Sequence, residues 1–151
     1  MVDCATLNPP YDFADLRHVV LIIKEESMNL LAVILVLIVA LLHIGFLLLE
    51  MVWWDKPLGR KVFRMSEEQA AATKVLAMNQ GLYNGFLAAG LLVGSLLGND
   101  VLVTFSLVCV IVAGVFGAMT VSSRILWIQA APAVAALVAC WIALRLIHPT
   151  I

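Results

Sequence analysis

Charged residues are scarce in this chain, and their scarcity excludes an ordinary soluble domain. Asp, Glu, Lys and Arg make up 13% of the 151 residues, whereas about 25% is usual in soluble domains. Hydrophobic residues account for 64% of the chain, and the mean hydropathy is +1.07. Such a composition is typical of a protein whose long apolar segments lie in a lipid bilayer.

Several functional classes lack the residues that they need. The formal net charge is -1, and no basic stripe exists outside one loop, so we expect no nucleic-acid partner. The three cysteines, Cys4, Cys109 and Cys140, have neither paired nor metal-ligand spacing. One histidine and one carboxylate, His43 and Glu50, are too few for a closed zinc site. We therefore expect no metal site and no cofactor.

Apolar residues fall into four long runs, each able to cross a bilayer as a helix. The runs cover about 29–52, 74–97, 101–121 and 125–147. About 20 apolar residues are enough for one crossing. A tight turn at Gly98-Asn99-Asp100 makes the second and third runs antiparallel. We therefore predict an all-α fold over residues 28–151, an antiparallel four-helix transmembrane bundle with a short basic cytoplasmic loop.

The first loop, residues 55–73, contains most of the basic residues of the chain. They include Lys56, Arg60, Lys61 and Arg64. Because they alternate with apolar residues, they favour a short segment lying on an anionic membrane surface. Ser66-Glu67-Glu68-Gln69 has the pattern of a capping box, which predicts that the next helix begins near Glu67.

The distribution of basic residues also predicts an orientation. The third loop contains Arg124, the second loop contains no basic residue, and Arg145 lies near the C-terminus. The positive-inside rule then places loops one and three in the cytoplasm and both termini outside. We expect a multi-pass protein of a bacterial inner membrane, with membrane lipids as its partners.

Residues 1–27 differ in character from the rest of the chain. Their apolar stretch, residues 19–23, is too short to cross a bilayer. Lys24-Glu25-Glu26 is what a purine-rich ribosome-binding sequence would encode if it were translated. One hypothesis is therefore that Met28, not Met1, is the natural start and that residues 1–27 are an over-called leader. The alternative is a mobile N-terminal tail.

Polar side chains interrupt the apolar runs, where lipid offers no hydrogen-bond partners. They are His43 and Glu50 on the first run, Asn79, Gln80, Tyr83 and Asn84 on the second, and Gln129 on the fourth. At about 1.5 Å per residue, all of them fall in the cytoplasmic half of the bilayer. We predict a shared polar pocket in which His43 and Glu50 transfer protons and the other five bind a ligand. The plainer interpretation is that these groups only hold the helices together.

Three functions are open at this point. The pocket could bind a lipophilic or amphiphilic small molecule, with acid–base, isomerase-like chemistry as the first reaction to test. A small proton-coupled transporter is the second alternative, because intramembrane ionisable groups mark proton pathways. A non-catalytic membrane subunit is the third. Rows of glycines on the second and third runs permit a homodimer through close helix approach.

Three segments of the chain are distinctive. They are Glu50-Met51-Val52-Trp53-Trp54, Pro57-Leu58-Gly59-Arg60-Lys61-Val62-Phe63 and Asn79-Gln80-Gly81-Leu82-Tyr83-Asn84-Gly85-Phe86-Leu87-Ala88-Ala89-Gly90. They resemble a family of small bacterial and fungal membrane proteins catalogued as domain of unknown function 1304. The resemblance covers about Met28 to the C-terminus. It implies four spans and a membrane location, but it implies no activity and assigns no catalytic residue.

Overall fold

The computed structural model describes residues 13–147, and its elements in that range are helices. They are α1 (Phe13–Met51), α2 (Pro57–Phe63), α3 (Glu67–Leu96), α4 (Asp100–Thr120), the π-helical turn η2 (Leu126–Ala130) and α5 (Ala131–Ile147). The predicted all-α class is therefore confirmed for the described residues. The predicted leader, residues 1–27, lies partly outside them, and from Phe13 onward it continues into α1 without a break. The natural start at Met28 stays a prediction.

Within residues 13–147, three segments are long and apolar enough to cross a membrane. They are Asn29–Met51, Asp100–Thr120 and Leu126–Arg145. They correspond to the first, third and fourth predicted runs. The second run lies in α3, where Asn79, Gln80 and Asn84 lower the hydropathy of an otherwise apolar helix. The described chain thus has the character of a multi-pass membrane protein with three candidate spans, where the sequence predicts four.

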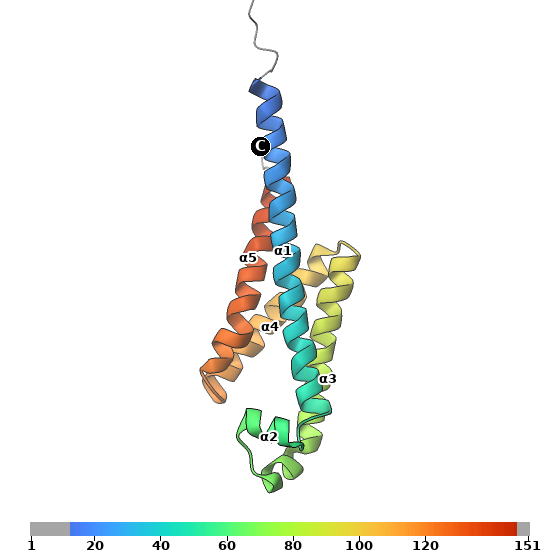
Figure 1. The fold of residues 1–151 in the computed structure, drawn as a ribbon, viewed down its shortest axis with the longest axis vertical. Helices are drawn as coiled ribbons and strands as arrows, with labels where there is room; N and C mark the ends of the chain where they lie inside the picture. Colours follow the sequence, from blue (N-terminus) through green and yellow to red (C-terminus); the bar gives the residue numbers. More distant parts are fainter. Residues whose placement is uncertain (1–12, 148–151) are drawn as a thin grey trace, which may run out of the picture.

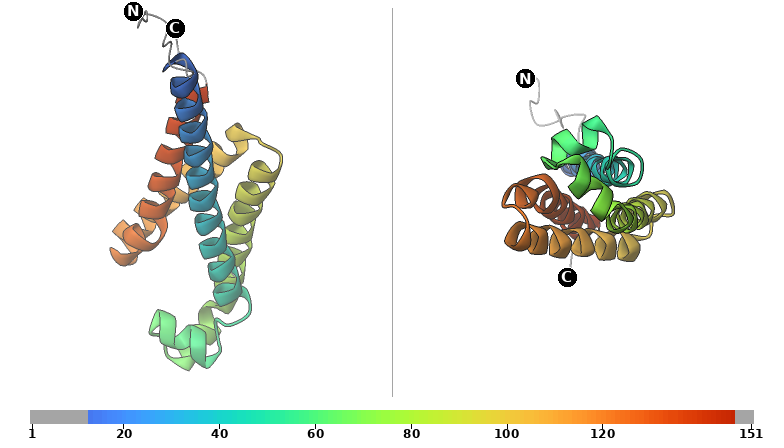
Figure 2. Two further views of the ribbon diagram at one scale, coloured as in Figure 1. Left: turned by 45° about the horizontal axis from the view of Figure 1, so that its top comes forward. Right: turned by 90° about the horizontal axis from the view of Figure 1, so that it is seen from below.

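The central helix of the fold is α1, which packs against α3 and α5. Figure 1 shows α3 beside the lower part of α1, while α4 runs obliquely behind the other long helices. The view from below in Figure 2 shows α4 along one side of the molecule, beside α5 and α3, with α1 on the opposite side of these two helices. With its oblique α4, the arrangement differs from a regular bundle of four aligned helices.

Small residues let α1 and α3 approach each other closely. Buried residues of α1 recur at spacings of four and three, at Val36, Ala40 and His43. Leu47 and Glu50 continue this spacing in the half-buried last turns of α1 and lie against Gly81 of α3. The buried residues of α3 have the same spacing, at Ala77, Gly81, Asn84, Ala88 and Leu91. This seven-residue repeat is typical of helices packed knobs-into-holes. Three polar side chains, His43, Glu50 and Asn84, therefore lie on the packed faces of the two helices.

The corner between α1 and α3 is held by side-chain contacts around α2. The helix α2 lies so close to the end of α1 that a Cβ on Gly59 would be 2.1 Å from the carbonyl oxygen of Trp53. The Trp54 indole donates a hydrogen bond to Thr73 on α3, at 3.1 Å. The predicted capping box is confirmed, because Ser66 and Gln69 exchange hydrogen bonds at the start of α3.

Candidate functional site

A carboxylate and an amide meet between α1 and α3. The Asn84 amide nitrogen, Nδ2, donates a hydrogen bond to Glu50 Oε2 at 2.7 Å. Asn84 is buried, with 6% of its surface exposed, and Glu50 is half-buried in the last turn of α1. The sequence placed both residues in one pocket, and the structure brings them into direct contact. The pair joins two helices through a hydrogen bond between side chains that are 34 positions apart in the chain.

Close approach of the two backbones makes this contact possible. A Cβ on Gly81 would lie 2.6 Å from Met51 Cγ and 3.1 Å from Glu50 Cβ. A Cβ on Gly85 would lie 2.5 Å from Leu47 Cδ1. The two glycines that flank Asn84 therefore let α3 sit against the last turns of α1, where the amide reaches the carboxylate.

His43 is fully buried on the same face of α1. Its Nδ1 lies 2.8 Å from the carbonyl oxygen of Val39, and its Nε2 has no hydrogen-bond partner among the described residues. A carbonyl oxygen accepts but cannot donate, so the hydrogen bond requires the proton on Nδ1. In the neutral ring, Nε2 then carries a free lone pair. The site therefore contains a buried hydrogen-bond acceptor that the described protein leaves unused.

The distance between His43 and the pair follows from helix geometry. Glu50 comes seven residues after His43, which is two turns and about 10 Å along α1. His43 also makes an edge-on contact with Phe46, with ring centroids 5.7 Å apart. Imidazole, carboxylate and amide thus lie along one strip of the α1–α3 interface, with His43 farther from the α2 end than Glu50.

The structure does not bring the other predicted site residues to this strip. Asn79 and Gln80 are exposed, and Tyr83 is 58% exposed, beside Phe86 of its own helix. They lie on faces of α3 other than the one formed by Gly81 and Asn84, because a helix turns about 100° per residue. Gln129 is half-buried in η2, and no described hydrogen bond links it to Glu50 or Asn84. Ligand binding by these four residues stays a prediction.

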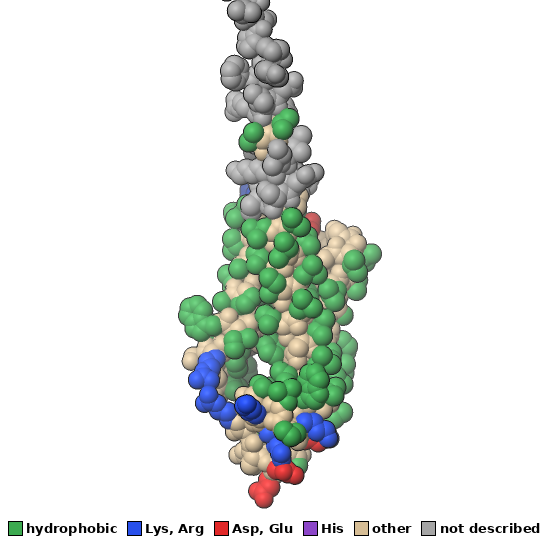
Figure 3. Space-filling model, viewed as in Figure 1, with side chains coloured by type: hydrophobic (Ala, Val, Ile, Leu, Met, Phe, Trp, Pro, Cys, Tyr) green, Lys and Arg blue, Asp and Glu red, His purple; other side chains and the backbone are tan. Residues whose placement is uncertain are grey.

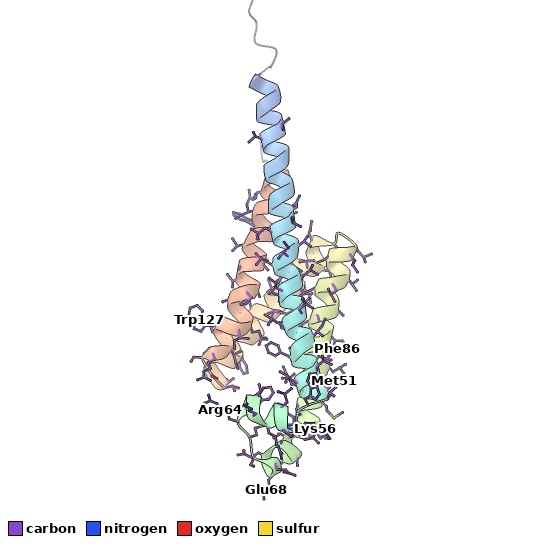
Figure 4. The ribbon with its side chains drawn as sticks, viewed as in Figure 1. Met51, Lys56, Arg64, Glu68, Phe86 and Trp127 are labelled. Carbon is purple, nitrogen blue, oxygen red and sulfur yellow. The ribbon has the colours of Figure 1, made fainter. Side chains whose placement is uncertain are left out.

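Basic side chains gather at the α2 end of the molecule, below an opening between α1 and the lower end of α5 (Figure 3). Figure 4 places Lys56, Arg64 and Glu68 at this end, while Trp127 points away from the helices. Among the described residues, no group of three or more His, Cys, Asp or Glu side chains could hold a metal ion. The side chains of the polar strip can donate and accept hydrogen bonds.

One cavity was not foreseen from the sequence. It has a volume of about 340 Å³ and is lined by Thr104, Leu137, Val138, Trp141 and Leu144. The lining comes from α4 and α5 and is almost entirely apolar. No local pattern marks it, because it depends on the oblique crossing of α4. It lies apart from the residues of the polar strip and adds no reactive group to them.

The chain is similar to known proteins over most of its length. Residues 37–141 match the family described as "Protein of unknown function (DUF1304)". A relative in Lactococcus lactis subsp. lactis (strain IL1403), the uncharacterized protein YpaA, is 30% identical over 115 residues, which cover 74% of this chain and 97% of the relative. No solved structure gives a significant match. The matched segment includes Glu50, Asn84 and His43, and the chain belongs to the family of domain of unknown function 1304.

Proposed function

We propose that this chain is a four-span membrane protein that binds a lipophilic or amphiphilic small molecule in a polar pocket around His43, Glu50 and Asn84. The observation that carries the proposal is His43 Nε2, which is buried without a hydrogen-bond partner among the described residues. Leaving a buried acceptor unpaired costs about 1–3 kcal/mol. A residue that served only to pack the helices would not need a polar side chain here, because an apolar side chain of similar size would fill the same place without this cost.

The fourth span of this proposal is α3. It has 30 residues, which at about 1.5 Å each is long enough to cross a bilayer. It packs along the lower part of α1, a candidate span, and a short turn joins it to α4, another candidate span. A helix held in this way shares the depth of its neighbours. Its amide side chains are then tolerated because Asn84 faces protein, and Asn79 and Gln80 lie toward the headgroups.

The orientation follows from the basic residues, with loops one and three in the cytoplasm and both termini outside, in a bacterial inner membrane. Glu68 and Leu97 are exposed at opposite ends of α3. In a chain without its three natural cysteines, a membrane-impermeant thiol reagent added to intact cells should label Leu97→Cys and leave Glu68→Cys unlabelled. Labelling of both, or of Glu68→Cys alone, contradicts the proposed topology.

The free acceptor, His43 Nε2, determines which hydrogen-bonding group the ligand must carry. A hydroxyl or N–H group can donate a hydrogen bond to His43 Nε2, whereas an ether oxygen or a carboxylate cannot. The remaining lone pairs of the Glu50 carboxylate are acceptors too. The proposed ligand is therefore an amphiphile whose headgroup carries hydrogen-bond donors and whose apolar tail lies in the bilayer.

Acid–base chemistry is the reaction that these residues would perform. A proton donated to His43 Nε2 in a hydrogen bond is also positioned for transfer to the ring. Glu50 lies on the same strip and can accept or return a proton at a second position. Removal of a proton from one atom of the ligand by either group, and return of the same proton by that group to a different atom, is an isomerisation. No external oxidant or reductant is needed for such a step.

A pair of probes that differ in one donor tests the binding proposal. We expect 1-dodecanol to raise the melting temperature of the purified protein more than dodecyl methyl ether does, because only the alcohol donates. The difference should disappear in His43→Met. Ser106→Ala, which removes another buried polar group on α4, serves as the matched control and should keep the difference. Equal shifts with both probes in the folded wild type contradict the role of His43 Nε2.

A further inference from the structure

The short helix α2 has an exposed apolar strip. Leu58 and Val62 are 49% and 51% exposed. They are four residues apart, so they lie on the same face of the helix. Gly59, which is buried against the end of α1, lies on a different face. The strip therefore points away from the contacts that hold α2 in place.

The position of α2 is fixed by the corner that surrounds it. Its Gly59 backbone lies against the Trp53 carbonyl, and its Phe63 ring packs on Trp54 with ring centroids 4.7 Å apart. Arg60 forms an ion pair with Glu67 at the start of α3. These contacts tie α2 to the segment that follows α1 and to the start of α3, so its exposed strip has a defined place at the end of α1.

Positive charge surrounds this strip. Residues 55–74 contain five basic and three acidic side chains, an excess of two. Arg60 pairs with Glu67, and Lys74 pairs with Asp55 at 2.8 Å. The remaining basic side chains, Lys56, Lys61 and Arg64, form no ion pair among the described residues. Figure 3 shows the basic side chains gathered over this end of the molecule.

We infer that α2 and its flanking cations form a binding surface for anionic phospholipid at the membrane interface. Leu58 and Val62 lie among the first methylene groups of the acyl chains, while Lys61 and Arg64 contact the lipid phosphates. A helix with an apolar strip bordered by Lys and Arg binds in the interface in this way. A second copy of the chain on this surface would bring like charges together, whereas an anionic headgroup neutralises them.

Lipid retention measures this surface directly. The full-length protein is placed in bilayers of equal parts phosphatidylglycerol and phosphatidylcholine, and the lipids that remain bound are counted by native mass spectrometry. We expect the wild type to retain phosphatidylglycerol preferentially. Each cation near an anionic surface contributes about fivefold in binding. Lys61→Gln and Arg64→Gln should each reduce the preference by about that factor, and the double variant by more.

Arg145→Gln is the matched control, since it removes one positive charge near the C-terminal end of α5, where Arg145 lies over the Trp141 ring. This variant should retain phosphatidylglycerol with the same preference as the wild type. An equal loss in Arg145→Gln and in Lys61→Gln would show a response to net charge alone and would overturn the inference. Unchanged preference in the folded Lys61→Gln, Arg64→Gln double variant would overturn it as well.

The apolar strip has a separate test. In a chain without its three natural cysteines, a bimane label on Val62→Cys should be quenched by phosphatidylglycerol brominated near the headgroup. Phosphatidylcholine with the same bromination should quench it less. A label on Glu68→Cys, which is exposed on the polar side of the same corner, should show little quenching by either lipid. Equal weak quenching at both positions contradicts an inserted α2.

Discussion

Asn84 Nδ2 donates to Glu50 Oε2 at 2.7 Å, across the contact between α3 and α1. The two residues are 34 positions apart in the chain, and they meet because Gly81 and Gly85 leave room for the last turns of α1. The amide is buried, so it donates this hydrogen bond to the carboxylate at a place that little water reaches. The contact is therefore both a link between two helices and the polar centre of the proposed pocket.

Removing the amide should destabilise the protein. Asn84→Ala leaves the half-buried Glu50 carboxylate without its protein donor, and we expect a loss of about 2 kcal/mol in the free energy of unfolding. Glu50→Gln keeps a hydrogen-bond acceptor at the same place, so its effect should be smaller. Both are measured by unfolding in mixed micelles, followed by circular dichroism. An Asn84→Ala variant as stable as the wild type would show that the hydrogen bond contributes nothing to the fold.

Replacing His43 should have the opposite effect. His43→Met removes the unpaired Nε2 and fills nearly the same volume, so we expect the free energy of unfolding to rise by about 1 kcal/mol. The Val39 carbonyl loses the hydrogen bond from the imidazole ring, but it still accepts the backbone hydrogen bond of the helix. His43→Gln retains a polar group and should give no such gain. A loss of several kcal/mol in His43→Met would show that the imidazole is a structural requirement.

The sequence predicts the elements well because their signals are local. The capping box at Ser66, the turn at Gly98 and the apolar runs each depend on neighbouring residues. The structure has the start of α3 at the first, the turn between α3 and α4 at the second, and long helices over the apolar runs. Glu50 and Asn84 could be predicted to lie in one pocket, because lipid offers polar side chains no hydrogen-bond partners.

The sequence could not distinguish which polar residues of α3 face inward. Asn79 and Gln80 are as polar as Asn84, and Tyr83 has a polar hydroxyl, yet among these four only Asn84 has the seven-residue register of Ala77, Gly81 and Ala88. Composition and depth give no information on that register until the packed face is known. The oblique path of α4 could not be predicted from the sequence either, because crossing angles depend on how several helices pack together.

Acid should weaken the corner between α1 and α3. The hydrogen bond from Lys74 lowers the pKa of the Asp55 carboxyl below its ordinary value. A carboxyl whose pKa is lower in the folded state stabilises the fold above its unfolded pKa, and this contribution disappears as the pH falls through the folded pKa. We therefore expect the wild type to melt higher than Asp55→Asn near neutral pH. The difference should vanish in acid, in melting curves recorded across the pH range. A difference that persists in strong acid would contradict a role for the ionised carboxylate.

Two glycines on facing helices should respond in opposite ways to the same substitution. A Cβ on Gly81 would lie 2.6 Å from Met51 Cγ, whereas a Cβ on Gly45 would have no atom within 4 Å. Gly81→Ala should therefore push α3 from α1 and cost about 1–3 kcal/mol in stability. Gly45→Ala should gain up to about 1 kcal/mol in stability, because alanine favours the helix over glycine. The same unfolding assay in micelles measures both variants.

A double variant tests whether Gly81→Ala also breaks the hydrogen bond between Glu50 and Asn84. If separation of the helices is the cause of the loss, Asn84→Ala should add little to Gly81→Ala, since the hydrogen bond is already broken. Full additivity of the two changes would show that α3 accommodates the extra methyl group without moving.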